Sequence, residues 1–263
     1  MRVVSEGLVA NYDAFPRIEE EFHAALEESL APRGPDVLYD LVARLGLPRG
    51  ASAIDAGCGE GLHAQRLTEL GFDVLGVDPV PRHIELAHEN APAARFVLGR
   101  LEELPAGDGS ADLVWCRDML ALVPDLDAAL AELARVLRPG GRAIVYSMFA
   151  TERLEPAESA SFWSATVVPS STDPARVEAA MERAGLHIDE RVLIGSDWGE
   201  WAEEDSGKPG KRLLWAARLL RAPDRYVERF GRANYDIMLH DCLWHVYAMI
   251  GKIERRAYVL TKR

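Results

Sequence analysis

Two patterns of apolar and polar residues alternate along the chain, and each predicts a different element. Short apolar runs indicate buried strands, and they occupy 51–56, 74–77, 95–98, 111–116, 142–148, 187–194 and 257–260. Apolar residues spaced three or four positions apart indicate amphipathic helices, and such stretches occupy 36–45, 81–89, 125–137 and 173–184. The alternation predicts strands connected by helices from residue 36 onward.

Two stretches lie outside this alternation. Residues 1–34 carry apolar side chains near helical spacing and predict an N-terminal helical segment. The insert 195–252, between the last two predicted strands, holds four of the six tryptophans. It predicts a helix over 211–220, a second over 224–250 that bends at Gly231, and a mobile polar loop over 203–210. We expect the insert to be a lid that also offers some interface.

A glycine-rich turn follows the first predicted strand. The segment from Asp55 to Gly61 reads Asp-Ala-Gly-Cys-Gly-Glu-Gly, and an amphipathic helix begins after it. Strand, glycine turn and helix open a nucleotide-binding βαβ unit, in which glycine allows positive φ and lets a ligand contact the main chain. The second strand ends at Asp78, near the position about 20 residues on where a carboxylate binds ribose hydroxyls. The dinucleotide fingerprint needs glycine at position 62, where Leu62 stands.

The Asp55–Gly61 pattern with Asp78 resembles motifs I and II of the class I S-adenosylmethionine-dependent methyltransferases. The resemblance implies that Asp55, Gly57 and Gly59 line the methionine half of S-adenosyl-L-methionine, and that Asp78 binds the ribose. Three further residues are expected beside this cofactor: Pro79 after Asp78, His63 in the first turn after the glycines, and Cys116 at the end of the fourth strand.

Two later segments bear on the same resemblance. Leu137-Arg138-Pro139-Gly140-Gly141 is a second match to the family. The segment 99–105 stands where the family often carries an acid that binds the adenine amino group, but Arg100 occupies that position. Leu101 is expected to offer its backbone N–H to the adenine ring, and Arg100 is either at the adenine site or a solvated loop residue. Tyr12 resembles a tyrosine that covers the cofactor mouth; the alternative is core packing of one aromatic residue.

The resemblance implies an α/β fold with a doubly wound, Rossmann-like seven-stranded sheet whose last strand is antiparallel. The expected organisation is an N-terminal helical cap over 1–34, a cofactor-binding core over 35–194, the helical lid over 195–252 and the last core strand over 253–263.

Composition restricts the partners. With 263 residues and 48% hydrophobic content, the chain can bury one domain with an elaboration. The net charge of −12 argues against a nucleic-acid partner, although a local basic patch remains possible. Apolar runs too short to span a bilayer and an N-terminus without a signal-peptide core predict a cytoplasmic protein with no membrane contact. Three scattered cysteines form neither a disulfide framework nor a zinc pattern, and no metal site is expected.

Methyl transfer from a sulfonium needs position and a dry pocket, and a general base only if the acceptor keeps its proton. Asp241 and His245 lie four residues apart on a predicted helix, so the carboxylate can orient the imidazole as a base. The alternative is an ordinary surface ion pair. Arg117 and Asp118 follow the fourth strand, beside the expected donor methyl. They either take part in catalysis, or they bind the cofactor tail and lead the chain into the next helix.

The sequence thus predicts a monomeric or homodimeric methyltransferase that acts on a small aromatic or otherwise apolar acceptor, with oxygen as the first expected target and carbon or nitrogen next. S-Adenosyl-L-homocysteine would be the product of the cofactor. Three alternatives remain: a dehydrogenase, a regulatory protein that binds S-adenosylmethionine without using it, and an enzyme that uses the sulfonium for another reaction.

Overall fold

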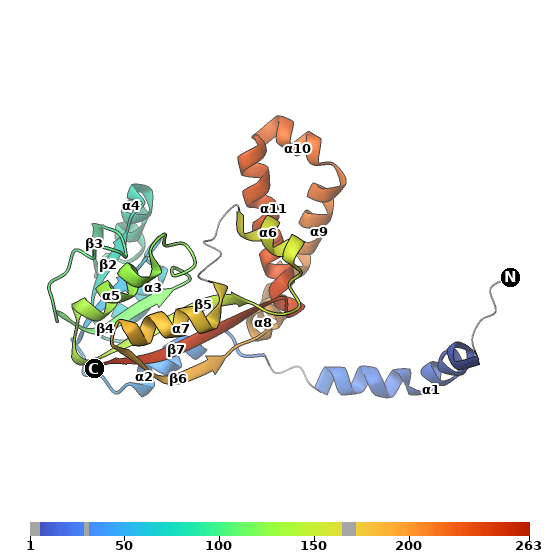
Figure 1. Cartoon of the computed structure of the whole chain (residues 1–263), viewed down its shortest axis with the longest axis horizontal. Helices are drawn as coiled ribbons and strands as arrows, with labels where there is room; N and C mark the ends of the chain where they lie inside the picture. The colour runs from blue at the N-terminus through green and yellow to red at the C-terminus, as the bar shows by residue number, and fades with distance from the viewer. Residues whose placement is uncertain (1–5, 29–31, 165–171) are drawn as a thin grey trace.

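The computed structural model describes residues 6–28, 32–164 and 172–263. Its centre is a seven-stranded sheet with the order β3-β2-β1-β4-β5-β7-β6, in which β7 runs antiparallel to β5 and β6 (Figure 1). This topology confirms the predicted fold class. The strands are β1 (Ser52–Ala56), β2 (Asp73–Asp78), β3 (Arg95–Leu98), β4 (Ala111–Arg117), β5 (Leu137–Ala150), β6 (Leu186–Leu193) and β7 (Ile253–Lys262).

Helices cover both faces of the sheet and form two apolar layers. On one face, α5 (Leu126–Val136) and α7 (Pro174–Arg183) bury their apolar stripes against β4 and β5. On the other, α2 (Val37–Arg44), α3 (Leu62–Glu69) and α4 (Pro81–Asn90) pack on β1 and β2. Asp125 and Asp173 accept hydrogen bonds from Ala128 N and Ala175 N, so each caps the N-terminus of its helix.

The insert is built differently from the prediction. It contains α8 (Asp197–Ser206), α9 (Lys208–Arg221), α10 (Pro223–Phe230) and α11 (Arg232–Met249). The predicted long helix breaks at Gly231, whose φ of 83° and ψ of 154° are not helical. The predicted mobile loop over 203–210 is mostly helical instead. Trp198 anchors α8 to the sheet, because its ring is buried and stacks on Tyr146 of β5 with 4.6 Å between the ring centroids. Local composition does not reveal this contact between distant segments.

The segment after β5 contains α6 (Pro156–Ser164), and residues 165–171 lie outside the described residues. None of the described helices combines the length and the apolar character that crossing a bilayer requires.

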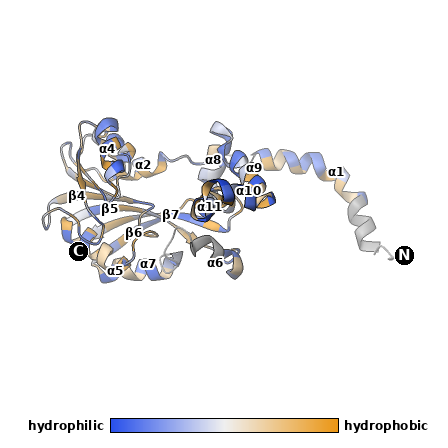
Figure 2. Cartoon of the chain, turned by 90° about the horizontal axis from the view of Figure 1, so that it is seen from above, coloured by the Kyte–Doolittle hydropathy of each residue, from blue (hydrophilic) through white to orange (hydrophobic). Residues whose placement is uncertain are grey.

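The N-terminal helix α1 (Glu6–Glu28) does not lie over the strand ends. It extends away from the sheet and beyond the insert (Figures 1 and 2). The described side chains between Asp13 and Glu27 are all exposed, and Phe15 and Phe22 are about half accessible. The side chain of Tyr12 lies outside the described part of the structure, so its expected contact with the cofactor stays a prediction. In this conformation α1 is an arm, and the predicted cap role of residues 1–34 stays a prediction.

Candidate functional site

The glycine turn leaves open space and one unsatisfied carboxylate. Gly57, Gly59 and Gly61 all have positive φ, as the sequence predicts. A Cβ at Gly59 would meet nothing within 4 Å, so this part of the turn has room for a ligand. A Cβ at Gly57 would instead overlap the Met119 side chain.

Asp55 lies at the end of β1 and is only 2% exposed. No described residue bonds to its Oδ2 atom. Burial, together with the nearby Asp78 carboxylate, raises the pKa of Asp55 to about 7, while Arg117 opposes the shift. A buried carboxylate with one unsatisfied oxygen fits a ligand with a cationic amino group, such as the methionine half of the expected cofactor.

Asp78 is held by donors on three sides. Its carboxylate accepts hydrogen bonds from Gly59 N at 3.0 Å, Val80 N at 2.9 Å and His83 Nδ1 at 3.0 Å. A carboxylate has about four acceptor positions, so capacity remains for a ribose hydroxyl. The side chain borders a cavity of about 270 Å³ whose lining also includes Pro79, Val80, His83, Arg100, Leu101, Glu102, Met119, Leu122, Val123 and Pro124.

This cavity brings together Asp78, Pro79, Arg100 and Leu101, four of the predicted cofactor residues. Arg100 is largely exposed, and its Nε lies 3.7 Å from Glu102, which favours a solvated loop residue at the rim. The Leu101 side chain is buried, so only its main chain is free to contact an adenine ring, and that contact stays a prediction.

A hydrogen-bonded chain fixes Arg117 at the end of β4. Its Nη1 donates to His63 Nε2, and the other ring nitrogen, Nδ1, lies 2.5 Å from the Tyr39 hydroxyl. Because arginine can only donate, His63 Nε2 must accept, and the proton of the neutral ring sits on Nδ1 and is donated to Tyr39. Burial and the Arg117 charge lower the pKa of His63 to about 4, which keeps the ring neutral. His63 therefore positions Arg117; its predicted contact with the cofactor remains untested.

Tyr39 and Trp198 are functional candidates that the sequence analysis missed. Tyr39 stacks on Trp115 at 5.2 Å, and the guanidinium of Arg117 lies 5.3 Å from the ring centroid of Trp198. Tyr39 follows the buried Leu38 in α2, and a tyrosine next to the buried face of a helix was the sequence feature that could have indicated its role. No comparable sequence feature indicated Trp198, because no helix or strand was predicted for its segment.

Asp118 has a backbone conformation that suits a functional site. Among the described residues it is the only non-glycine with positive φ, 59°. Aspartate tolerates this region better than most residues, and such conformations cluster at active sites. Burial raises the pKa of Asp118, while the charges of Arg117 and Arg255 oppose the shift. Its Oδ2 lies 3.4 Å from Arg117 Nε, so the two predicted residues form a pair.

A second cavity, of about 330 Å³, lies where β4, β5 and β7 meet the insert. Arg117 and Asp118 line it from β4 and the turn after it, Arg255 from β7, and His245 from α11. Aromatic rings form much of the remaining wall: Tyr146, Trp198, Trp201 and Trp244. A charged floor under aromatic walls is suited to bind a small acceptor beside the glycine turn. We call it the acceptor cavity.

The predicted Asp241–His245 pair is not formed as expected. The Asp241 carboxylate pairs with Arg212 of α9, and His245 Nδ1 lies 2.9 Å from the main-chain oxygen of Asp241. A carbonyl only accepts, so Nδ1 carries the proton and Nε2 keeps its lone pair. In this structure the carboxylate therefore bonds to the guanidinium of Arg212 on the neighbouring helix and not to the imidazole, and its predicted orienting role stays a prediction. His245 itself lies at the acceptor cavity and keeps a basic nitrogen.

Arg255 was also missed, although the sequence contained a signal. The apolar run that indicated the last strand covers only 257–260, whereas β7 begins at Ile253. In that longer strand, Ile253, Ala257 and Val259 are buried on the side of the sheet that Arg255 shares. A charged residue at an inward-facing position of an apolar strand is unusual enough to be a candidate.

The Cys116 thiol is buried in the core, where burial raises its pKa, and the predicted place of Cys116 beside the cofactor stays a prediction. No three His, Cys, Asp or Glu side chains gather with metal-site geometry in the described part of the chain.

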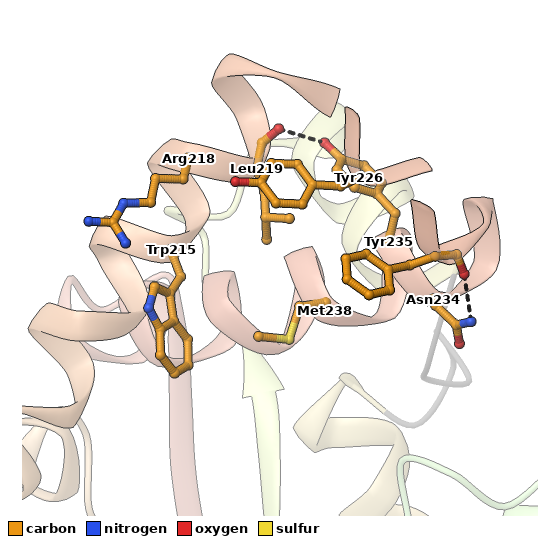
Figure 3. Close-up of a pocket in the computed structure, with 8 residues that line it drawn as sticks. Trp215, Arg218, Leu219, Tyr226, Asn234, Tyr235 and Met238 are labelled. Atoms are coloured by element: carbon orange, nitrogen blue, oxygen red, sulfur yellow. Dashed lines mark hydrogen bonds between the residues drawn. The ribbon is translucent and has the colours of Figure 1, made fainter. Parts of the chain in front are cut away.

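A larger cavity, of about 480 Å³, lies within the insert (Figure 3). Its lining is mostly aromatic and aliphatic: Trp215, Arg218, Leu219, Tyr226, Phe230, Asn234, Tyr235 and Met238. Tyr235 Oη donates to the Leu219 carbonyl at 3.4 Å, and Asn234 Nδ2 donates to the Phe230 carbonyl at 2.8 Å. Asn234 and Met238 precede His245 along α11 by about 10 to 16 Å, at 1.5 Å per residue. This cavity is therefore separate from the strand ends, where the candidate chemistry lies.

Comparison with known proteins points to one family. The family model described as "Methyltransferase domain" matches residues 54–145. A ubiquinone biosynthesis O-methyltransferase from Xanthomonas axonopodis pv. citri (strain 306) is 30% identical over 185 residues, which cover 65% of this chain and 77% of that protein. A malonyl-[acyl-carrier protein] O-methyltransferase from Serratia marcescens is 36% identical over 106 residues, 40% of this chain. That match spans only 41% of the relative's own length.

Among solved structures, geranyl diphosphate C-methyltransferase from Streptomyces coelicolor A3(2), in complex with Mg²⁺, geranyl diphosphate and S-adenosyl-L-homocysteine, shares the fold. The TM-score is 0.61 at 14% sequence identity, with 86% of this chain and 76% of that chain covered.

Proposed function

Because the chain belongs to the class I S-adenosylmethionine-dependent methyltransferases, we propose that it transfers a methyl group to a small aromatic or otherwise apolar metabolite, with oxygen as the preferred acceptor atom. One observation carries the proposal: the acceptor cavity opens at the end of β4, next to the glycine turn, and joins a basic imidazole nitrogen to aromatic walls. The two O-methyltransferase relatives favour oxygen over carbon or nitrogen.

The cofactor residues divide between two regions of the strand ends. Asp55 would bind the amino group of the methionine half, Gly59 would give the cofactor room, and Asp78 would bind the ribose hydroxyls. Pro79, Leu101 and Arg100 would border the adenine. When bound, the sulfonium supplies an activated methyl group.

The chain's own residues then have to position and deprotonate the acceptor. Trp198, Trp201 and Trp244 exclude water and hold an apolar acceptor. His245 Nε2 is the candidate base for an acceptor hydroxyl, since Nδ1–H is occupied by the Asp241 carbonyl. Arg117 and Asp118 neutralise each other at the cavity floor and keep it preorganised. α8 and α11 act as a lid over this cavity, and we assign the protein to the cytoplasm.

The deciding experiment incubates the purified protein with S-adenosylmethionine and a library of phenols, enols and organic acids. Formation of S-adenosylhomocysteine in equimolar amount with a product heavier by one methylene is the expected result. Cofactor binding without either product would instead favour a regulatory protein, and a nicotinamide-dependent reaction would return the dehydrogenase alternative.

A further inference from the structure

Arg255 is a buried cation in the wall of the acceptor cavity. Its residue is only 7% exposed, and no described residue accepts a hydrogen bond from its Nη1 atom. None of the ion pairs within 4 Å among the described residues includes it; the nearby Asp118 pairs with Arg117 at 3.4 Å. Buried charges are costly unless they are paired, so an unpaired guanidinium in a cavity wall indicates that a ligand supplies the partner.

A second buried donor belongs to another residue of the same cavity wall. Trp198 is 8% exposed, and no described residue accepts from its Nε1–H. Both Trp198 and Arg255 line the acceptor cavity. Two unsatisfied donors at one cavity fit a ligand group with two acceptor oxygens and a negative charge, and a planar carboxylate matches a guanidinium best.

The position of β7 assigns this anion to the acceptor rather than to the cofactor. Asp78 and Asp55 end β2 and β1, which lie on one side of β4, while β5 and then β7 lie on the other. Neighbouring strands are about 4.8 Å apart, so the backbone of Arg255 on β7, two strands from β4, lies about 10 Å from β4. Arg117, held by His63 at the end of β4, separates the two regions.

The remaining walls of the acceptor cavity indicate the chemistry of the part of the ligand that carries the anion. Tyr146 and Trp198 stack on each other at 4.6 Å, and Trp201 and Trp244 complete the aromatic wall. Flat aromatic ligands pack well on such walls. In a chain of net charge −12, a local site with two arginines and one aspartate also selects anions over cations.

We propose that Arg255 and Trp198 bind a carboxylate of the acceptor, so that the substrate is an aromatic carboxylic acid. The inference rests on the proposed methyl transfer and specifies its substrate class. Arg255 is a recognition residue in this proposal, and His245 remains the candidate base.

The test measures binding of benzoate, cinnamate and indole-3-acetate, each beside its primary amide, by calorimetry in saturating S-adenosylhomocysteine. We expect at least one acid to bind, its amide to bind at least about tenfold more weakly, and Arg255→Met to lose at least about tenfold in affinity for the acid. Arg44→Met is the matched control, because Arg44 pairs with Glu190 on the surface and its loss removes the same charge.

Three results would overturn the inference: no acid binds the wild-type protein, an amide binds as tightly as its acid, or Arg255→Met binds the acid normally. Failure of the wild-type protein to bind S-adenosylhomocysteine would instead contradict the proposed function. The two failures are thus distinguishable.

Thermal unfolding separates recognition from a structural role. Methionine keeps the length of the arginine stem and removes an unpaired buried charge, so we expect the melting temperature of Arg255→Met without ligand to equal or exceed that of the wild type. A melting temperature several degrees lower would mean that Arg255 stabilises the fold, and the recognition role would then be rejected.

Discussion

At the scale of single residues, the site includes three deeply buried polar side chains that the fold leaves partly unsatisfied. Asp55, Trp198 and Arg255 are each more than nine-tenths buried, and each has a polar atom with no partner among the described residues. Natural sequences satisfy most buried polar groups, and exceptions concentrate where a ligand completes the set.

Asp78→Ala should weaken S-adenosylmethionine binding about ten- to a hundredfold. A charge-assisted hydrogen bond contributes about 1.5–3 kcal/mol, and the substitution also removes the acceptor for Gly59 N and Val80 N. Asp73→Ala, at the exposed start of the same strand, is the matched control. Calorimetric titration with unchanged affinity in Asp78→Ala would remove the ribose assignment.

Asp55→Asn should stabilise the ligand-free protein at pH 8 and weaken cofactor binding. The folded pKa of Asp55 is raised to about 7 from 3.8, so the folded state holds the proton more tightly than the unfolded state. The resulting contribution to the free energy of unfolding is fully present below pH 4 and is lost as the pH rises through 7.

At pH 8 the wild-type carboxylate therefore costs up to about 4 kcal/mol that asparagine avoids. We expect the melting temperature to rise by several degrees at pH 8 and by much less at pH 5. Equal shifts at both pH values would show that Asp55 does not titrate in this range.

At the scale of elements, α11 links the packing of the insert to the acceptor cavity. Asp241 binds α11 to α9 through Arg212, while His245, one turn later, faces the acceptor cavity. One helix therefore carries both a structural contact and the candidate base, and the two functions can be separated by substitution.

His245→Ala should lower turnover about 10²–10⁴-fold and leave cofactor affinity unchanged, as expected for loss of a general base. His187→Ala, on the exposed side of β6, is the control. Normal turnover in His245→Ala would leave catalysis to positioning by Arg117 and Asp118.

Asp241→Asn should lower turnover much less, by less than about tenfold. The imidazole bonds to the main-chain oxygen of residue 241, which the substitution keeps, and only the partner of Arg212 is weakened. A loss as large as that of His245→Ala would restore the carboxylate as the orienting group.

At the scale of the whole molecule, the chain divides into a covered core and an exposed arm. Arg33 contacts Asp197 and the Leu193 carbonyl, so the chain is anchored to α8 and β6 just after α1. Before that anchor, the described side chains of α1 are exposed, and they contribute little to core stability.

Deletion of residues 1–28 should therefore shift the melting temperature by less than about 2 °C. It should also leave S-adenosylmethionine affinity within about threefold, because the cavities described here are lined by residues from Pro35 onward. A tenfold loss of cofactor affinity in the truncated protein would return α1 to the predicted role of a cap.

The sequence by itself determined the sheet, its connecting helices and the region of the cofactor. Strands such as β3, predicted and observed over 95–98, depend on apolar runs and on turns a few residues away. The glycine turn and Asp78 depend on backbone conformation and on chain spacing, which neighbours in sequence fix.

Only the tertiary structure decided the partners of the charged residues and the path of the insert. Asp241 has two basic neighbours within reach, and the packing of α9 on α11 chose Arg212 over His245. α8 forms where Trp198 meets Tyr146, and Arg255 is buried because β7 is longer than its apolar run. Each of these features depends on contacts between segments that lie far apart in the chain. The strength of such contacts depends on distance and burial rather than on spacing along the sequence.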